Sequence, residues 1–286
     1  MKKMAYLGPP GTFSNMALDV YLKRHNMLAD PMPASSIFDL FTWLSEKKCD
    51  EIIVPVENSV EGSVTTTLDL MIQSENVVVT AELSIEVVHC LMSLPGCRIE
   101  SITDIMSHPQ VLAQCSHYIH QKFPKVRTHQ TSSTAVAVEQ MVKGAISPDL
   151  ENPIVAVIGN RELATLYGLD ILDSSVNDYP NNRTRFAVIG YKQTHSTGQD
   201  KTSVILSTTK DKSGGLYEVL GEFADRDINL TKISSRPTKE VLGEYLFFID
   251  FEGHNEDKKV KDTLDAIKLK TSYFKNLGSY RRDTII

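Results

Sequence analysis

The sequence lacks long apolar runs. Its least polar stretch, residues 87–94, is far too short to span a bilayer, which takes about 20 consecutive apolar residues. Residues 1–7 carry two lysines, but no apolar core of signal-peptide length follows them. We therefore expect a cytoplasmic protein with neither an export signal nor a membrane anchor.

Cysteine is scarce as well. The four cysteines form no C-x-x-C pair and show no histidine spacing typical of zinc. They are Cys49, Cys90, Cys97 and Cys115. We expect reduced, mostly buried thiols and no metal site.

An excess of positive charge is also missing. Thirty lysines and arginines stand against 36 aspartates and glutamates, a formal net charge of −6 and a pI near 5.8. This balance argues against nucleic acid or an anionic membrane as the main partner. A small anionic substrate stays possible, because a local cationic pocket can exist in an acidic protein. With 41% apolar and 23% charged residues the composition is that of a globular protein.

Strand and helix patterns alternate through the first two thirds of the chain. Strands are expected at residues 4–7, 52–56, 77–92, 102–107, 126–130, 154–158 and 184–190. Helices are expected at residues 13–23, 37–47, 65–72, 111–122, 133–143 and 161–167. This order predicts an α/β fold of two or three lobes, with parallel sheets covered by helices on both faces. Ligands of such sheets bind on loops beyond the carboxyl ends of the strands.

The last third of the chain has a different order of strand and helix patterns. Residues 192–201 are polar and aperiodic, which is typical of a linker. The patterns that follow read β-α-β-β-α-β, with strands at 202–207, 229–235, 245–251 and 273–277 and helices at 215–224 and 260–269. This is the ferredoxin-like order. We therefore divide the chain into domains at 1–191 and 202–286, joined by the linker 192–201.

Five polar loops lie where ligands of an α/β sheet bind. They are residues 8–14, 54–64, 107–114, 132–135 and 177–186. The first lacks the lysine of a P-loop and the G-x-G-x-x-G pattern, so it gives no support to nucleotide binding. Each loop also has a purely structural explanation as a turn, a helix cap or a solvated surface. His108 is better explained as a cap than as a general base, and Cys115 as a core residue. Together the loops favour a small polar anion as ligand.

Four of these loops resemble, in order, the motifs of the prephenate dehydratase family. The matching motifs are Gly8-Pro9-x-Gly11-Thr12-Phe13-Ser14, Pro55-x-Glu57-Asn58-Ser59, Ser107-His108-Pro109-Gln110 and Asn182-x-Thr184-Arg185-Phe186. Residues 214–216, 229–233 and 235–237 resemble an ACT regulatory domain. The resemblance covers nearly the whole chain. One departure concerns Ser234, which stands where the ACT motif usually has glutamate before Ser-Arg-Pro.

The resemblance implies a catalytic domain of two lobes, like type II periplasmic binding proteins, with the active site in the cleft. It implies the loss of water and carbon dioxide from prephenate to give phenylpyruvate, on the route to phenylalanine, without cofactor or metal. The implied catalytic residues are Thr184, Asn58, Ser107 and Gln114. The residues expected to bind the substrate are Glu57, Ser59, Thr12, Ser14, Ser132, Arg185 and Phe186, with Arg185 as the candidate partner of a substrate carboxylate.

The resemblance also implies feedback control. L-Phenylalanine is expected to bind between paired ACT domains, which requires at least a homodimer, or a homotetramer. The expected effector-binding residues are Gly214, Gly215, Leu216, Asn229, Leu230, Ser235 and Arg236.

Two alternatives remain open. Arogenate dehydratase would use the same fold and elimination on a substrate with an amino group. A non-catalytic amino-acid sensor would need an output module, for which the assigned elements leave no room. We do not expect a fused chorismate mutase, because no helical extension precedes Met4.

Overall fold

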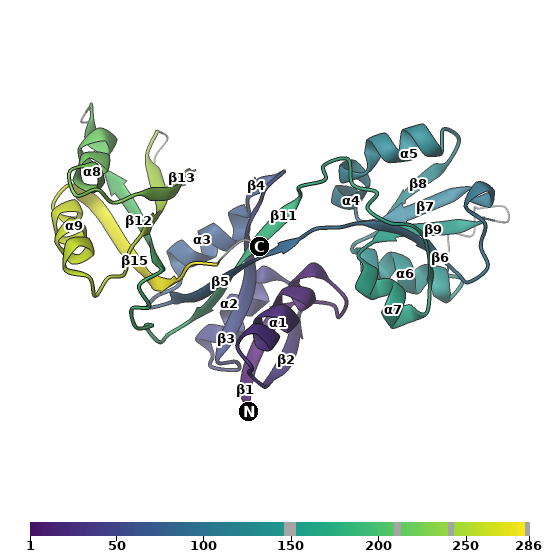
Figure 1. The fold of residues 1–286 in the computed structure, drawn as a ribbon, viewed down its shortest axis with the longest axis horizontal. Coiled ribbons are helices and arrows are strands. Elements are labelled where there is room, and N and C mark those ends of the chain that lie inside the picture. The colour runs from purple at the N-terminus through teal and green to yellow at the C-terminus, as the bar shows by residue number, and fades with distance from the viewer. Residues whose placement is uncertain (146–152, 209–212, 240–242, 284–286) are drawn as a thin grey trace.

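The structure, a computed structural model, describes residues 1–145, 153–208, 213–239 and 243–283. They form three bodies in a row, with the C-terminal domain at one end, a first lobe in the centre and a second lobe at the other end (Figure 1). The two lobes and the ferredoxin-like domain confirm the predicted fold class.

The first lobe is built on a six-stranded sheet of order β2-β1-β3-β11-β5, with β4 paired to β3. Its strands are β1 (Lys2–Leu7), β2 (Ala29–Ala34), β3 (Glu51–Asn58), β4 (Gly62–Ser63), β5 (Val78–Glu86) and β11 (Arg183–Gly190). Its helices are α1 (Phe13–Arg24), α2 (Ile37–Ser45) and α3 (Thr65–Gln73). Successive strand residues face opposite sides, so Ile53 packs in the core with α1 while Ile52 and Val54 pack with α2 and α3.

The second lobe is built on a five-stranded sheet of order β10-β6-β9-β7-β8. Its strands are β6 (Cys90–Ser93), β7 (Asp104–Ser107), β8 (Arg127–Gln130), β9 (Val155–Gly159) and β10 (Asp170–Asp173), and a 3₁₀ turn, η1, spans Ile99–Ser101. Its helices are α4 (Pro109–Gln114), α5 (Ser116–Lys122), α6 (Thr134–Val142) and α7 (Arg161–Tyr167). Buried residues of α6 and α7 share one core, and those of α4 and α5 share another, so both faces of the sheet are covered.

Two chain segments cross between the lobes. One joins β5 to β6, and the other leads from β10 to β11 (Figure 1). They are bonded to each other: Val87 N–H donates to Asn182 O at 2.8 Å, and Val176 N–H to His89 O at 2.8 Å. The Asn177 side chain bridges them too, accepting from His89 N–H and donating to Val87 O, both at 2.7 Å. The two lobes are thus joined by two short segments that are hydrogen-bonded to each other.

The C-terminal domain has a four-stranded sheet of order β13-β14-β12-β15. Its elements are β12 (Asp200–Thr208), α8 (Gly215–Ala224), β13 (Leu230–Pro237), β14 (Tyr245–Glu252), α9 (Lys258–Lys268) and β15 (Thr271–Arg281). The helices cover one face and share a core with Val204, Leu206 and Phe251. The other face carries Ile205 and Phe248, which belong to the same core as α2 and α3 of the first lobe. The domain is therefore packed onto the first lobe through an apolar interface.

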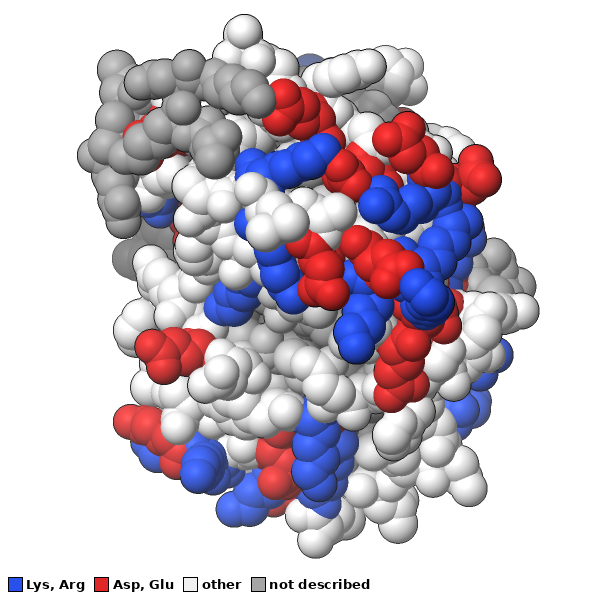
Figure 2. Space-filling model, turned by 90° about the vertical axis from the view of Figure 1, so that its left-hand side faces the viewer, with Lys and Arg blue, Asp and Glu red and all other residues white. Residues whose placement is uncertain are grey.

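The helical end of this domain carries charges of both signs, interspersed over the surface (Figure 2). On α9, Lys258 pairs with Asp262 and Lys268 with Asp265. The strand β12 begins at Asp200, so the last two residues of the expected linker belong to the sheet.

Three local expectations were wrong. The sheets of both lobes are mixed instead of parallel, because β11 runs antiparallel to β3 and β5, and β6 antiparallel to β9 and β10. The strands β2 and β10 were missed; β2 contains Pro31 and Pro33, which are tolerated because it lies at the sheet edge. The helix expected over 111–122 is two helices, broken at Cys115.

Candidate active site

The strands β3 and β11 bring Asn58 and Thr184 together. Their antiparallel register places Thr184 opposite Asn58, although 126 positions separate them in the sequence. The Asn58 side-chain Nδ2 donates to Thr184 Oγ1 at 3.0 Å and to Asn182 Oδ1 at 2.7 Å. Asn58 Oδ1 accepts from the N–H groups of Val60 and Glu61 at 3.0 and 3.1 Å. Because those donors are backbone groups, the amide can point only one way, with its NH₂ toward Thr184.

The pair continues into a hydrogen-bond network that reaches the second lobe. Gln114, on α4, offers its Oε1 to Asn182 Nδ2 at 3.1 Å and to His89 Nε2 at 3.0 Å. Its own Nε2 donates to Glu61 Oε1 at 2.7 Å. Three of the four residues expected to be catalytic, Asn58, Gln114 and Thr184, are thus joined through Asn182.

His89 is a buried, neutral member of this network. Its ring is 1% exposed and meets the edge of Phe13 at a centroid distance of 5.5 Å. Burial lowers the pKa of His89, and the hydrogen bond to Gln114 opposes this only in part. Since Gln114 Oε1 can only accept, Nε2 carries the proton and Nδ1 is left bare; Nδ1 has no partner within the described residues. Nothing in the sequence pattern of residues 77–92 had singled this residue out.

Glu61 connects the two lobes across the cleft. Its carboxylate accepts from Gln114 and, at 2.6 Å, from Gln110 Nε2 on the same helix of the second lobe. Glu61 itself follows β3 of the first lobe. Glu61 lies in the polar loop 54–64 and Asn182 in a family motif, but no role was predicted for either, because a local pattern does not reveal which side chain reaches across to another element.

A cavity of about 890 Å³ lies between the lobes. Residues 7–14 and 33–35 of the first lobe line it, together with residues 108, 110–111, 132–136, 160 and 163 of the second. Among the described residues that line it there is no lysine or arginine. Four helix caps lie on its wall instead: Thr12, His108, Ser133 and Asn160, at the N-termini of α1, α4, α6 and α7. Helix N-termini present free N–H groups and a positive dipole end, so the cavity suits an anion.

Three of the predicted substrate-binding residues line this cavity, namely Thr12, Ser14 and Ser132. Thr12 Oγ1 caps α1 by accepting from Asn15 N–H at 3.3 Å and also donates to Leu7 O at 3.0 Å. The predicted Ser107 is fully buried just behind the wall: its hydroxyl donates to Ile158 O at 2.6 Å and lies 3.3 Å from the hydroxyl of the lining residue Thr134.

The other predicted substrate-binding residues lie elsewhere. Ser59 Oγ accepts from Arg183 N–H and donates to Asn181 O, tying β3 to β11. Phe186 is 1% exposed in the core beneath α1. Neither lines the cleft cavity, and Asn58, Gln114 and Thr184 are not among its lining residues either.

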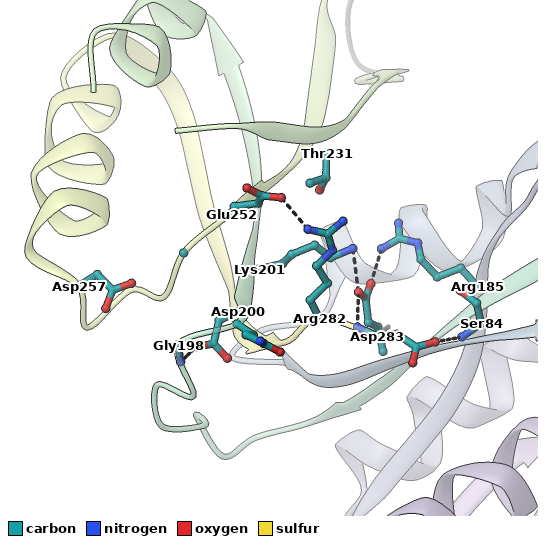
Figure 3. Close-up of a pocket in the computed structure, with 13 residues that line it drawn as sticks. Ser84, Arg185, Gly198, Asp200, Lys201, Thr231, Glu252, Asp257, Arg282 and Asp283 are labelled. Atoms are coloured by element: carbon teal, nitrogen blue, oxygen red, sulfur yellow. Dashed lines mark hydrogen bonds and ion pairs between the residues drawn. The ribbon is translucent and has the colours of Figure 1, made fainter. Parts of the chain in front are cut away.

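Arg185 and Glu57 belong to the contact with the C-terminal domain. The Arg185 guanidinium pairs with Glu57 at 3.3 Å, Glu82 at 3.2 Å and Asp250 at 3.0 Å. Burial disfavours its charged form, but the carboxylates outweigh this and raise the pKa of Arg185. It lines a second cavity, about 800 Å³, between the domains (Figure 3), where Arg185 and Lys201 both pair with the Glu82 carboxylate, at 3.2 and 2.8 Å. A substrate carboxylate in the cleft cavity would have to draw Arg185 away from three partners.

The predicted effector residues gather at two places. Gly214, in the left-handed region at φ 82°, precedes α8, which begins with Gly215 and Leu216. Asn229 and Leu230 open β13. Arg236, farther along β13, is already bonded to Asp69 of α3 at 2.8 Å. Ser235 neighbours it, and Ser234 faces the first lobe, with its hydroxyl 3.5 Å from that of Ser63.

No group of three or more metal-ligating side chains occurs in the part of the chain that the structure describes. Nor is any described helix both long and apolar enough to cross a membrane.

The chain is similar to known proteins over nearly its whole length. The family model "Prephenate dehydratase" matches residues 4–194, and the model "ACT domain" matches residues 202–268. A prephenate dehydratase of Methanocaldococcus jannaschii is 36% identical over 281 residues, covering 98% of both chains. A bifunctional chorismate mutase/prephenate dehydratase of Neisseria gonorrhoeae is 36% identical over 277 residues, which are 97% of this chain and 74% of the relative. The crystal structure of prephenate dehydratase from Arthrobacter aurescens in complex with L-Phe is 32% identical, with a TM-score of 0.86 over 98% of this chain and 90% of that one.

Proposed function

The chain belongs to the prephenate dehydratase family, and from that premise we propose that it converts prephenate to phenylpyruvate under control by phenylalanine. In this reaction the carbon–carboxylate bond breaks and CO₂ is released, while the electron pair of that bond enters the ring. The ring becomes aromatic as its carbon–oxygen bond breaks, and the departing hydroxide takes up one proton to form water. The reaction requires no electron acceptor. The protein has two tasks, which are to bind a substrate with two negative charges and to help hydroxide leave.

The observation that carries the proposal is the orientation of the Thr184 hydroxyl. Asn58 Nδ2 donates to Thr184 Oγ1, and no described residue accepts the hydroxyl proton in return. That proton is therefore free to be donated to a ligand. A threonine hydroxyl is far too weak an acid to protonate the ring hydroxyl before the carbon–oxygen bond breaks, but a fixed donor stabilises the charge that develops on the leaving oxygen. Asn58 fixes the donor, and Gln114 holds Asn58 through Asn182.

The cleft cavity supports a dianionic substrate. The helices α1 and α6 direct their N-termini into it from opposite lobes, and their first N–H groups are not used within the helix. The absence of lysine and arginine from the described lining has a mechanistic benefit. A carboxylate held by a strong ion pair would be slow to leave as CO₂, whereas one held by neutral dipoles loses less when its charge disappears. Arg185 remains a candidate for the other carboxylate, if substrate binding rearranges its ion pairs.

The regulatory half of the proposal rests on the C-terminal domain. L-Phenylalanine binds between two such domains, at Gly214–Leu216 of one chain and Asn229–Leu230 of another, so the working unit is at least a homodimer. The enzyme acts in the cytoplasm, where free thiols stay reduced. All four cysteines are free and three of them are buried.

The test is an assay of purified protein with prephenate and with arogenate in parallel. Formation of phenylpyruvate from prephenate, with little or no phenylalanine formed from arogenate, supports the proposal. The reverse preference would assign the chain to the arogenate reaction. If neither substrate is turned over and an aromatic amino acid binds tightly, the chain would instead be a non-catalytic amino-acid sensor.

A further inference from the structure

Two neighbouring strands each carry a charged residue directly beside a proposed catalytic residue. On β3, Glu57 precedes Asn58, and on β11, Arg185 follows Thr184. The register pairs Glu57 with Arg185 and Asn58 with Thr184. A shift of either charged residue along its strand therefore moves one partner of the Asn58–Thr184 hydrogen bond. The pairing becomes irregular immediately after Arg185, where a β-bulge makes the strand locally adaptable.

The C-terminal domain supplies an ionic partner to each of these charges. Lys232 Nζ, from β13, lies 3.0 Å from Glu57 Oε2, the same oxygen that accepts from Arg185 Nε. Asp250 Oδ2, from β14, lies 3.0 Å from Arg185 Nη1. Lys232 and Asp250 are paired in register, so they project from the same face of their sheet. With Glu82 and Lys201, which pair at 2.8 Å, these residues form an interdomain charge cluster of three cations and three carboxylates.

Most of the cluster is shielded from water, and Glu57, with 36% of its side chain exposed, is its most open member. The side chains of Lys232 and Asp250 are 11% and 9% exposed. Lys232 Nζ and Asp250 Oδ2 have no well-directed hydrogen bond within the described residues, so ion pairing across the domain boundary is what holds them. Interactions between charges in such surroundings are stronger than at an open surface and are little screened by salt. A small displacement of β13 or β14 therefore acts directly on Glu57 and Arg185.

One strand joins this cluster to the proposed effector site. Asn229 and Leu230 open β13, and from Lys232 onward every second residue faces the first lobe. These contacts join Lys232 to Glu57, Ser234 to Ser63 and Arg236 to Asp69. A ligand that tilts or orders the start of β13 thus moves a row of contacts, of which only the Lys232 contact is next to a proposed catalytic residue.

We infer that Lys232 and Asp250 are positioning residues for the reaction. They hold Glu57 and Arg185, and through them Asn58 and Thr184, and phenylalanine bound at the start of β13 inhibits by shifting this cluster. The inference rests on the proposed function and adds the route by which the effector site reaches the cleft.

The experiment compares full-length Lys232→Met with Lys239→Met. Lys239 also forms an ion pair across the domain boundary, to Asp69, but that pair lies away from Asn58 and Thr184. For Lys232→Met we expect kcat to fall by about threefold to tenfold with KM unchanged. We expect inhibition by saturating phenylalanine to weaken by about fivefold or more. Calorimetric binding of phenylalanine should stay within about threefold of wild type. Lys239→Met should match wild type in all three measurements.

Two further variants guard against a merely structural effect. Asp250→Asn keeps the shape of the side chain and the hydrogen bond that Ser203 donates to Oδ1 at 2.6 Å, but removes the charge facing Arg185. It should reproduce the weakened inhibition. Lys232→Arg keeps the positive charge and should recover at least part of the kcat and of the inhibition by phenylalanine that Lys232→Met loses. A Lys232→Arg that recovers nothing would contradict a role for the charge.

The inference is overturned if Lys232→Met and Asp250→Asn both keep wild-type kcat and full inhibition. It is also overturned if both lose phenylalanine binding, because the cluster would then belong to the effector site. Failure of the proposed function looks different, since the wild-type protein itself would then not turn over prephenate.

Discussion

The amide of Asn58 donates a 3.0 Å hydrogen bond to the hydroxyl of Thr184 across the paired strands β3 and β11. The bond occupies one acceptor position of the threonine hydroxyl, so the hydroxyl proton is directed away from Asn58. Hydrogen bonds through Asn182 connect this pair to Gln114 of the second lobe. The adjacent residues Glu57 and Arg185 form ion pairs with Lys232 and Asp250 of the C-terminal domain.

Thr184→Val removes the proposed donor to the leaving oxygen while keeping the shape of the side chain. We expect kcat to fall by about 10²–10³, with KM changed little, because a donor of this kind acts mainly in the transition state. Thr184→Ser, which keeps the hydroxyl, serves as the matched control and should retain most of the activity. Steady-state kinetics with prephenate measures both, and a Thr184→Val enzyme as active as the serine variant would rule out the role.

Glu61→Ala removes the carboxylate that accepts from Gln110 and Gln114 across the cleft. The site is partly exposed, so we expect a loss of about 1 kcal/mol in cleft closure, seen as a rise of about fivefold in KM. Glu46→Ala, which removes a surface ion pair with Lys48 on α2's C-terminal side, is the control and should have no effect. An unchanged KM in Glu61→Ala would show that the interlobe contact does not contribute to substrate binding.

His89 gives the stability a dependence on pH. Its folded-state pKa is lowered by burial, so below the pKa of about 6.5 in the unfolded chain the unfolded state binds more protons than the folded state. Stability should therefore fall as the pH drops from about 7 toward the lowered folded pKa. Urea unfolding of His89→Gln, which can still donate to Gln114, should show a weaker fall over this range. Equal pH profiles for variant and wild type would contradict a buried neutral histidine.

Asp104 should contribute stability with a pH dependence of the same sense, but in a lower pH range than His89. Its side chain is fully buried, and burial alone would raise its pKa. Hydrogen bonds from Arg127, Thr103 and His129 overcome this and lower the pKa. The stabilisation is thus complete above the unfolded pKa of about 3.9 and is lost as the pH falls through the lower folded value. Asp104→Asn should cost about 1.5–3 kcal/mol in urea unfolding at pH 7, and the difference from wild type should shrink below about pH 4. A constant difference down to pH 3 would argue against an ionised Asp104.

The sequence allowed the fold class to be predicted because its patterns are local. The six elements of the C-terminal domain and most catalytic-domain elements follow from periodicity of apolar residues. Two strands are exceptions, because tertiary contacts override the local pattern. The strand β2 forms despite Pro31 and Pro33, since one edge of the strand is free. The strand β11 pairs antiparallel in the first sheet, although the preceding segment of the chain forms the second lobe.

The site was predictable only as a set of residues, not as an arrangement. The family resemblance identified Asn58, Gln114 and Thr184, but it did not show that Asn182 links them, and His89 belongs to no motif. Arg185 sits one residue from Thr184, and neighbours on a strand point to opposite faces. Alternation alone therefore predicts that the two side chains diverge, and the structure places Arg185 at the interdomain contact. Which partner it meets there depends on how the domains pack, which no local pattern encodes.

The most direct measurement is the rate of phenylpyruvate formation from prephenate by the purified full-length protein, with and without L-phenylalanine. The account predicts steady turnover without added metal or cofactor, suppressed by phenylalanine in a saturable way. Absence of phenylpyruvate under these conditions, with the protein folded and its substrate intact, would contradict it.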